Sequence, residues 1–256
     1  MPPDIAQQLW DARHNGRTVT ADALGAISGH TAAYALQTAV TTLSGAAVVG
    51  WKLGATSAAS QKAFGLSGPF YGPLLAPFCF AAGTTVTGAA AFGPGAEGEF
   101  ALTMGADLPP RDAPYTEDDV AGAVDSVCPA LEIAGTRLAG GLLKADPQHL
   151  IADDAANIAF IAGDPVADWR AIDLAAQTVT LTINGAEKAA GTGALALGGP
   201  LTALTWFANT LREQGRGLTA GEIITTGTCT GFVPLNPGDQ VVVDCGALGQ
   251  VSATVA

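Results

Sequence analysis

The chain has 256 residues, of which 48% are hydrophobic and 13% are charged, and its formal net charge is −12. This composition excludes a disordered chain, because the apolar content is sufficient for a sizeable core. The negative charge, with no basic stripe to offset it, argues against nucleic acid as a partner, since phosphates would be repelled. So few charged residues suit a surface partly covered by other copies of the chain, and we expect a homo-oligomer.

The sequence contains no segment that suggests export or membrane insertion. Residues 1–17 lack the basic start and apolar core of a signal peptide, and the apolar stretch 194–208 is interrupted by Gly198, Gly199 and Pro200. The four cysteines show neither a Cys-x-x-Cys pair nor zinc spacing, which favours reduced thiols. We therefore expect a cytoplasmic protein without a membrane partner.

The amino-terminal part, residues 1–47, is expected to be helical. Asp4 can cap a helix that ends near Gly16, and Thr31 can begin a second helix that continues to Leu43. From residue 48 onward, short apolar segments are separated by glycine and proline, which is typical of strands.

The second part, residues 48–256, is predicted to be a β-rich catalytic core that still contains two helices. Thr116 and Asp119 form a capping pair for a helix through Val124. Pro200 can begin the other helix, because proline fits the first helical turn.

The other segments of this core are predicted to be strands. Residues 177–183 alternate apolar residues with threonine and lead into Asn184-Gly185, a strong signal for a hairpin. Three more strands are expected over residues 222–226, 240–245 and 250–255. Helices first and mostly strands afterwards indicate an α+β fold in one domain, residues 1–256, rather than a βαβ array.

Three glutamates, Glu97, Glu99 and Glu132, stand beside or within apolar, strand-like sequence. Alternation places Glu97 and Glu99 on one face of a strand, opposite Phe100 and its apolar neighbours. Buried carboxylates need a partner, and three converging carboxylates suit a hard divalent cation such as Mg²⁺ or Mn²⁺. Such an ion would keep about three of its six positions for substrate and water, as in a catalytic site.

Simpler interpretations exist for these charged residues. Glu97 and Glu99 alone could form a solvated strand edge, whereas Glu132 lies among apolar residues. Lys52 is a lone cation in an apolar run, where it could extend to solvent from a strand end or face the metal site, pairing with substrate or transferring a proton. The run 226–231 could be a tight turn or a cradle for a carboxylate.

Several motifs occur in an order and spacing that together are specific. They are 33–37, 49–57, 71–75, 97–101, 129–133, 152–155, 197–201, 221–227 and 237–239. On these motifs the chain resembles the 2-keto-4-pentenoate hydratases (2-hydroxypentadienoate hydratases) of the fumarylacetoacetate hydrolase superfamily.

The resemblance implies a mixed β-roll or sandwich core of the fumarylacetoacetate hydrolase C-terminal type, with helices around it. It also implies a Mg²⁺ or Mn²⁺ site and a small 2-oxo acid substrate. Glu97, Glu99 and Glu132 match the family's metal ligands, and Lys52 matches its active-site lysine. Glutamate rather than aspartate at position 132 favours the hydratase and decarboxylase branch over the hydrolases.

The residues expected to contact substrate are Thr56, Ser57, Leu74, Arg137, Asp153, Thr226 and Thr228. The chain also departs from the family pattern, because Gly135, Asp154 and Ala156 stand where relatives commonly have aspartate, asparagine and serine. Polar groups near the substrate are therefore expected to be fewer.

The expected function is a metal-dependent hydratase that adds water to 2-hydroxypenta-2,4-dienoate or a similar 2-oxo acid in aromatic catabolism. One alternative is an oxalocrotonate-type decarboxylase, which would need a partner for a second substrate carboxylate. A hydrolase of acylpyruvates and a non-catalytic family member that acts as an assembly partner are the others.

Overall fold

The computed structural model describes residues 5–256, so the expected cap at Asp4 lies outside the described residues. Three helices come before the first strand, namely α1 (Ile5–His14), α2 (Ala21–Leu24) and α3 (Gly29–Ser44). α3 begins two residues before the expected start at Thr31 and ends where Gly45 adopts a left-handed conformation, with a φ of 62°. These helices account for the helical pattern of the amino-terminal sequence.

Two mixed sheets form most of the remaining chain. The larger has eight strands in the order β2 (Phe70–Leu75), β1 (Val48–Gly54), β10 (Ile223–Thr225), β5 (Gly95–Met104), β6 (Val124–Ala134), β7 (Asn157–Ala162) and β3 (Cys79–Ala81), with β11 (Val233–Pro234) beside β5. The smaller has five, in the order β4 (Thr84–Val86), β13 (Gln250–Val255), β12 (Gln240–Asp244), β8 (Thr178–Ile183) and β9 (Ala186–Thr192). The expected α+β class is confirmed.

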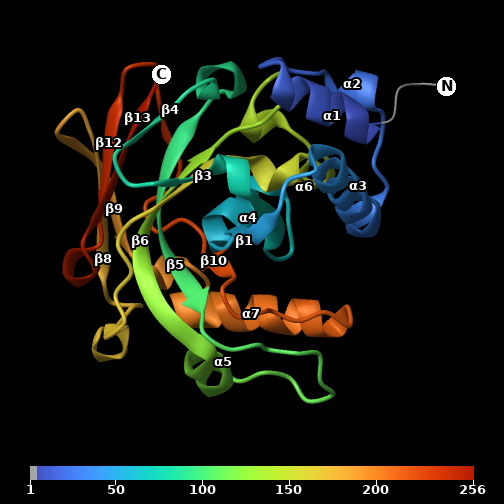
Figure 1. Cartoon of the computed structure of the whole chain (residues 1–256). Helices are drawn as coiled ribbons and strands as arrows, with labels where there is room; N and C mark the ends of the chain where they lie inside the picture. The colour runs from blue at the N-terminus through green and yellow to red at the C-terminus, as the bar shows by residue number, and fades with distance from the viewer. Residues whose placement is uncertain (1–4) are drawn as a thin grey trace.

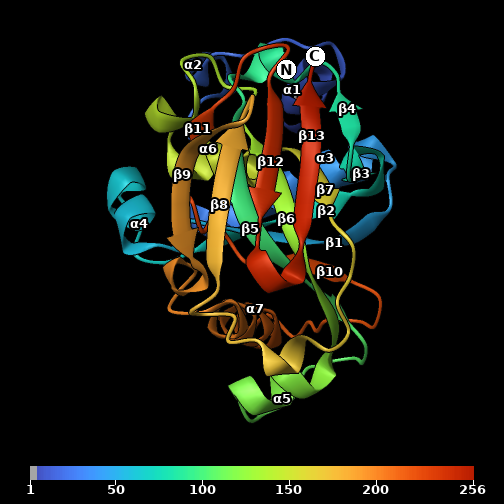
Figure 2. The same ribbon diagram turned by 90° about the vertical axis from the view of Figure 1, so that its left-hand side faces the viewer.

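The two sheets pack face to face (Figures 1 and 2). The smaller sheet covers one face of β5 and β6, and α1, α3 and α6 (Pro147–Ala152) lie on the other side of the larger sheet. At Gly98 of β5, an added Cβ atom would lie 3.0–3.1 Å from side-chain atoms of Val179, Thr230 and Val243. The sheets therefore pack closely at this position, where β5 has no side chain.

The remaining helices are α4 (Ala58–Phe64), α5 (Glu117–Ala123) and α7 (Pro200–Glu213). The capping box of Thr116 and Asp119 is confirmed, because each side chain accepts a hydrogen bond from the other residue's backbone N–H. The prediction that this helix includes Val124 is wrong, since Val124 is extended, buried and the first residue of β6. Asn184 and Gly185 form the expected hairpin turn between β8 and β9, with φ values of 53° and 78°.

The alternation along β5 is as the sequence predicts. Phe100 and Leu102 are fully buried in the core that includes residues of the smaller sheet. Glu97 and Glu99 therefore face the opposite side, toward the helices. A shift of one residue in this strand would place both carboxylates in the core between the sheets, so the apolar face fixes the position of the acidic one.

We predict that Gly50→Ala destabilises the protein. Gly50 pairs with Ile223 across the parallel strands β1 and β10, and an added Cβ atom would lie 1.9 Å from the Ile223 carbonyl oxygen. Separating these strands should lower the free energy of unfolding by roughly 1–3 kcal/mol, measured by urea denaturation. Gly68→Ala is the control, because its Cβ atom would meet nothing within 4 Å; equal midpoints for both variants would contradict the prediction.

Candidate metal centre

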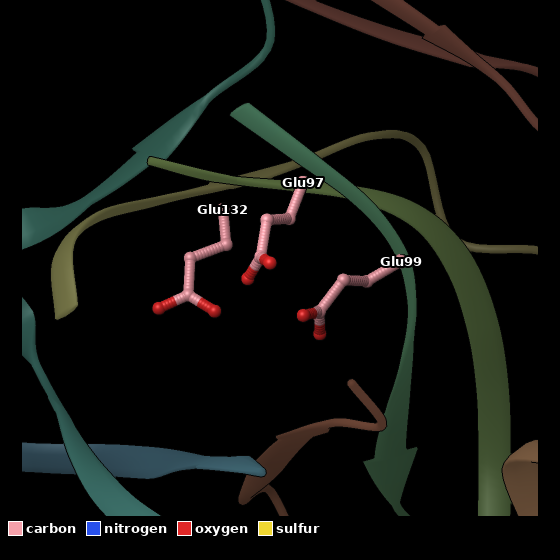
Figure 3. Close-up of side chains that lie close together, drawn as sticks. All are labelled: Glu97, Glu99 and Glu132. Carbon is pink, nitrogen blue, oxygen red and sulfur yellow. The ribbon is translucent and has the colours of Figure 1, made fainter. Parts of the chain in front are cut away.

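The three glutamates meet on neighbouring strands. β5 and β6 run antiparallel, with Glu97 directly opposite Glu132 and Glu99 two residues further along β5. One carboxylate oxygen from each residue lies within 4.8 Å of the others, and all three side chains point into the same space (Figure 3). Like charges directly opposite one another on a sheet are destabilising, so this arrangement requires a positive partner.

A solvated edge does not explain these carboxylates. Glu99 is 0% exposed and Glu132 is 1% exposed, whereas Glu97 is partly exposed. Burial, together with the charge of Glu132, raises the pKa of Glu97 to about 7 despite the opposing effect of Lys52. Burial and the charges of Glu132 and Glu97 likewise raise the pKa of Glu99 well above its usual value.

The hydrogen bonds of the glutamates fit a divalent cation. The backbone N–H of Gly227 donates to Glu99 Oε2 at 3.0 Å, and the Asn157 amide donates to Glu132 Oε1 at 3.1 Å. The other oxygens, Glu99 Oε1 and Glu132 Oε2, are buried and have no hydrogen-bond partner among the described residues. Glu99 and Glu132 thus each have one oxygen oriented by the protein and one available as a ligand, which is the arrangement expected around Mg²⁺ or a similar ion.

Lys52 extends from β1 into the same space. Its Nζ atom lies 3.1 Å from Glu132 Oε1 and donates to the Ala155 carbonyl at 3.0 Å. Burial alone would lower the pKa of this amine, but the charges of Glu132, Glu97 and Glu99 outweigh that effect and raise it. Lys52 is therefore a buried ammonium ion rather than a lysine that extends to solvent, and one of its three N–H groups remains for a ligand.

The carbonyl that receives Lys52 belongs to a strained turn. Asp154, Ala155 and Ala156 all have positive φ values, of 57°, 51° and 64°, and each such residue without glycine's freedom costs roughly 1–3 kcal/mol. Gly72 of β2 makes room for this turn, because a Cβ atom there would lie 2.5 Å from that of Ala155. The surrounding structure holds the turn in a conformation that its own sequence does not favour.

Two of the expected substrate-binding residues lie beside this centre. Thr228 lines the same cavity as Lys52 and Glu97, and its hydroxyl accepts hydrogen bonds from the backbone N–H groups of Thr230 and Gly231. The Thr56 hydroxyl is buried with no partner among the described residues. A Cβ atom on Gly227 would lie 1.9 Å from that hydroxyl, so Thr56 lies against the turn that holds Glu99.

Three others have structural contacts of their own. The Thr226 hydroxyl donates to the Phe100 carbonyl at 3.2 Å. Ser57 caps α4 through a reciprocal pair with Ser60. Leu74 is buried in an apolar cluster with Ala101, Cys128, Ala130 and Phe160.

Arg137 and Asp153 pair with each other instead of lining the cavity. The Arg137 Nε atom lies 2.6 Å from Asp153 Oδ1, and both side chains are buried. A second guanidinium nitrogen of Arg137 donates to the Asn157 carbonyl at 2.6 Å. These contacts hold the backbone of Asn157. They do not favour direct contact of Arg137 or Asp153 with substrate, which stays a prediction.

Two residues at the site were not singled out by the sequence. Asn157, which orients Glu132, is a lone amide at the start of the apolar strand β7, and that contrast was the available signal. Arg13 contacts the strained turn from α1, but a single cation near a helix end looks like any solvated residue.

The cavity beside the glutamates is small and mostly apolar. It has a volume of about 50 Å³. Among the described residues that line it, Lys52 and Glu97 are the charged ones. The apolar part of its wall consists of Leu53, Ala55, Phe64, Phe70, Ala134, Leu142, Leu150, Ala155 and Ala156. A larger groove, of about 850 Å³, lies beside Trp51 and α3, and none of the three glutamates lines it.

An acidic triad beside a buried lysine is the arrangement of a metal-dependent enzyme class. Comparisons with known proteins agree. Residues 66–256 match the family model described as Fumarylacetoacetate (FAA) hydrolase C-terminal. The chain is 32% identical over 253 residues to a 2-keto-4-pentenoate hydratase of Paraburkholderia xenovorans (strain LB400), covering 97% of this chain and 92% of that protein.

Decarboxylases are similar to the chain as well. A 4-oxalocrotonate decarboxylase of Pseudomonas putida is 34% identical over 206 residues, covering 80% of this chain and 76% of that protein. A solved structure of 4-oxalocrotonate decarboxylase from Pseudomonas putida G7, complexed with magnesium and adipate, matches with a TM-score of 0.89 and 31% identity over 98% of this chain and 96% of that chain. The chain therefore belongs to the 2-keto-4-pentenoate hydratase family of the fumarylacetoacetate hydrolase superfamily.

Two further expectations concern the thiols and the membrane. All four cysteines are free thiols, as expected. Within residues 5–256, no helix combines the length and apolar character needed to cross a bilayer.

We predict that metal binding stabilises the protein more at high pH than at low pH. The folded-state pKa of Glu97 is raised from 4.5 to about 7, so the folded protein binds this proton more tightly than the unfolded chain does. The stability that the proton contributes to the metal-free protein is fully present below pH 4.5 and is lost as the pH rises through 7. A divalent cation replaces those protons, so the rise in Tm caused by Mg²⁺ should be larger at pH 8 than at pH 5.5. Thermal denaturation in Mg²⁺ and in EDTA measures this difference.

Glu132→Gln is the matched variant for that experiment. It keeps the size of the side chain but removes one ligand charge, so the Mg²⁺-dependent rise in Tm should be largely lost. A rise of the same size at both pH values in the wild type, or an undiminished rise in the variant, would contradict the assignment of the site.

Proposed function

We propose that the protein is a metal-dependent hydratase that converts 2-hydroxypenta-2,4-dienoate, or a closely related 2-oxo acid, to the 4-hydroxy-2-oxo acid. The observation that carries this proposal is the cluster of Glu97, Glu99 and Glu132 beside the buried ammonium of Lys52. It occurs in a chain whose similarity to a 2-keto-4-pentenoate hydratase extends over 97% of its length.

We propose Mg²⁺ or Mn²⁺ as the metal, held by the three glutamates. The oxygen-only donor set favours these hard ions, and the decarboxylase structure matched above contains magnesium. When bound, the ion would supply Lewis-acid stabilisation for the 2-oxygen of the substrate.

The chain's own residues complete the site. The remaining N–H of Lys52 would donate to the substrate oxygen that gains charge when the 2-hydroxyl loses its proton. The Thr56 and Thr228 hydroxyls would hold the substrate carboxylate at the turn that contains Gly227. A proton is then added at C5 to give the conjugated 2-oxo acid, and water adds its hydroxyl to C4 and its proton to C3.

The cavity wall favours a monoacid over a diacid. A second carboxylate would enter a pocket lined by Phe64, Phe70, Leu142 and Leu150, with Lys52 as the cation among the described lining residues. An unpaired carboxylate there would lose its hydration without compensation. The same wall suits the uncharged end of a pentadienoate, and it favours the hydratase over the decarboxylase alternative.

We also propose that the enzyme is a cytoplasmic homo-oligomer. The four free thiols are typical of a reducing compartment. The low content of charged residues, 13% of the chain, suits a surface partly covered by other subunits.

The proposed activity predicts metal-dependent loss of the dienol absorbance of 2-hydroxypenta-2,4-dienoate. Purified protein should form 4-hydroxy-2-oxopentanoate with Mg²⁺ or Mn²⁺ and none with EDTA. Lys52→Met should reduce kcat by about 100-fold or more, and Glu132→Ala should abolish the activity. The diacid 4-oxalocrotonate should not be decarboxylated; efficient CO₂ release from it, without turnover of the monoacid, would overturn the hydratase assignment.

Thr56→Val should separate activity from stability. Because the Thr56 hydroxyl is buried without a partner, its removal should leave the free energy of unfolding unchanged or slightly higher, while kcat/KM falls about 10- to 100-fold through loss of a hydrogen bond to a charged substrate. Thr226→Val is the contrast, since that hydroxyl bonds a carbonyl and its loss should cost about 1 kcal/mol. Wild-type kcat/KM in Thr56→Val would exclude the substrate contact.

A further inference from the structure

Arg13 is anchored deep inside the protein although it belongs to the first helix. Its guanidinium lies 3.0 Å from Asp154 Oδ2 and donates to the carbonyls of Asn157 at 2.9 Å and Ile158 at 3.0 Å. It also lies 3.7 Å from the centroid of the Phe78 ring. With only 6% of its side chain exposed, Arg13 is not a solvated residue of a helix surface.

The acceptors of Arg13 belong to the segment that shapes the metal centre. Asp154 begins the turn of three left-handed residues, and the next carbonyl, of Ala155, receives Lys52 Nζ. Asn157, at the end of the turn, donates to Glu132. A shift of this segment would therefore move the partners of both Lys52 and Glu132.

Two arginines that do not line the cavity hold the segment. Arg137 pairs with Asp153 and Arg13 pairs with Asp154, and both donate to the same carbonyl, that of Asn157. The two positive and two negative charges balance, so this cluster is not a site for an anion. No hydrogen bond or ion pair among the described residues joins Arg13 to Lys52 or to the three glutamates, so its effect must pass through the turn.

We infer that Arg13 is a positioning residue of the active centre, which acts through Asp154 and the Asn157 carbonyl to fix the turn that orients Lys52 and Glu132. Helix α1 then helps to set the geometry of the active centre, in addition to packing over the sheet. The effect on turnover rests on the proposed function, whereas the effect on the metal site does not.

Arg13→Met tests this inference, because methionine fills similar space without charge or donors. We expect kcat per metal-loaded enzyme to fall by about 10- to 100-fold and the Mn²⁺ dissociation constant, measured by EPR titration, to rise about 10-fold, as when a partner behind a metal ligand is lost. Arg111→Met is the control, since Arg111 also pairs with an aspartate, Asp119, but the pair is exposed. The control should change neither quantity.

Asp154→Asn and the double variant with Arg13→Met show whether the two residues act as a unit. Asparagine has no charge to leave unpaired, so the double variant should recover about 10-fold of the activity that Arg13→Met loses. If Arg13→Met does not fold, Arg13→Lys replaces it; lysine keeps the charge but not the planar set of donors, and its kcat and Mn²⁺ affinity should fall in the same direction.

A merely structural role would give a different result. Wild-type kcat and Mn²⁺ affinity in the Arg13 variant, with only a lower Tm, would overturn the inference. If the wild-type enzyme binds Mn²⁺ but does not consume the dienoate, the proposed function fails, and the Mn²⁺ affinities of the variants still decide the role of Arg13.

Discussion

The clustering of three carboxylates, two of them fully buried, around one ammonium ion is the constraint on which the rest of this structure depends. Glu97, Glu99 and Glu132 meet at neighbouring positions of β5 and β6, with Lys52 as their one close cation among the described residues. Lysine alone leaves two negative charges uncompensated, and a divalent cation balances them. Because unpaired buried charges are costly, Glu97 and Glu99 hold protons more tightly than exposed carboxylates do, with raised pKa values, and a bound metal would displace those protons.

The two faces of β5 differ in polarity and in what they contact. One face is dry and packs against the smaller sheet, with Gly98 allowing the close approach. The other face carries the carboxylates and opens toward the helices. The apolar face fixes the register of the strand, and the register in turn aims the glutamates, so the stability of the sandwich and the geometry of the metal site have one physical origin.

The strained turn at residues 154–156 shows how distant parts of the chain share in this geometry. Three consecutive residues in a left-handed conformation persist because the surrounding residues hold them. These are Arg13 of α1, Arg137 of the loop after β6, Gly72 of β2 and Lys52. Strain stored in this way is typical of functional sites, where the surrounding fold keeps a carbonyl or side chain in a position that it would not adopt alone.

The sequence by itself determined the features with a local signal. The alternation around Glu97, the capping box at Thr116 and the turn at Asn184 each follow from a periodicity or a residue preference within a few positions, and the motif order indicated the family. Only the tertiary structure decided that Arg137 pairs with an aspartate rather than lining the cavity, that Arg13 reaches a turn 141 positions away, and that this turn is left-handed. Those outcomes depend on contacts between residues far apart in the chain, for which no local pattern exists.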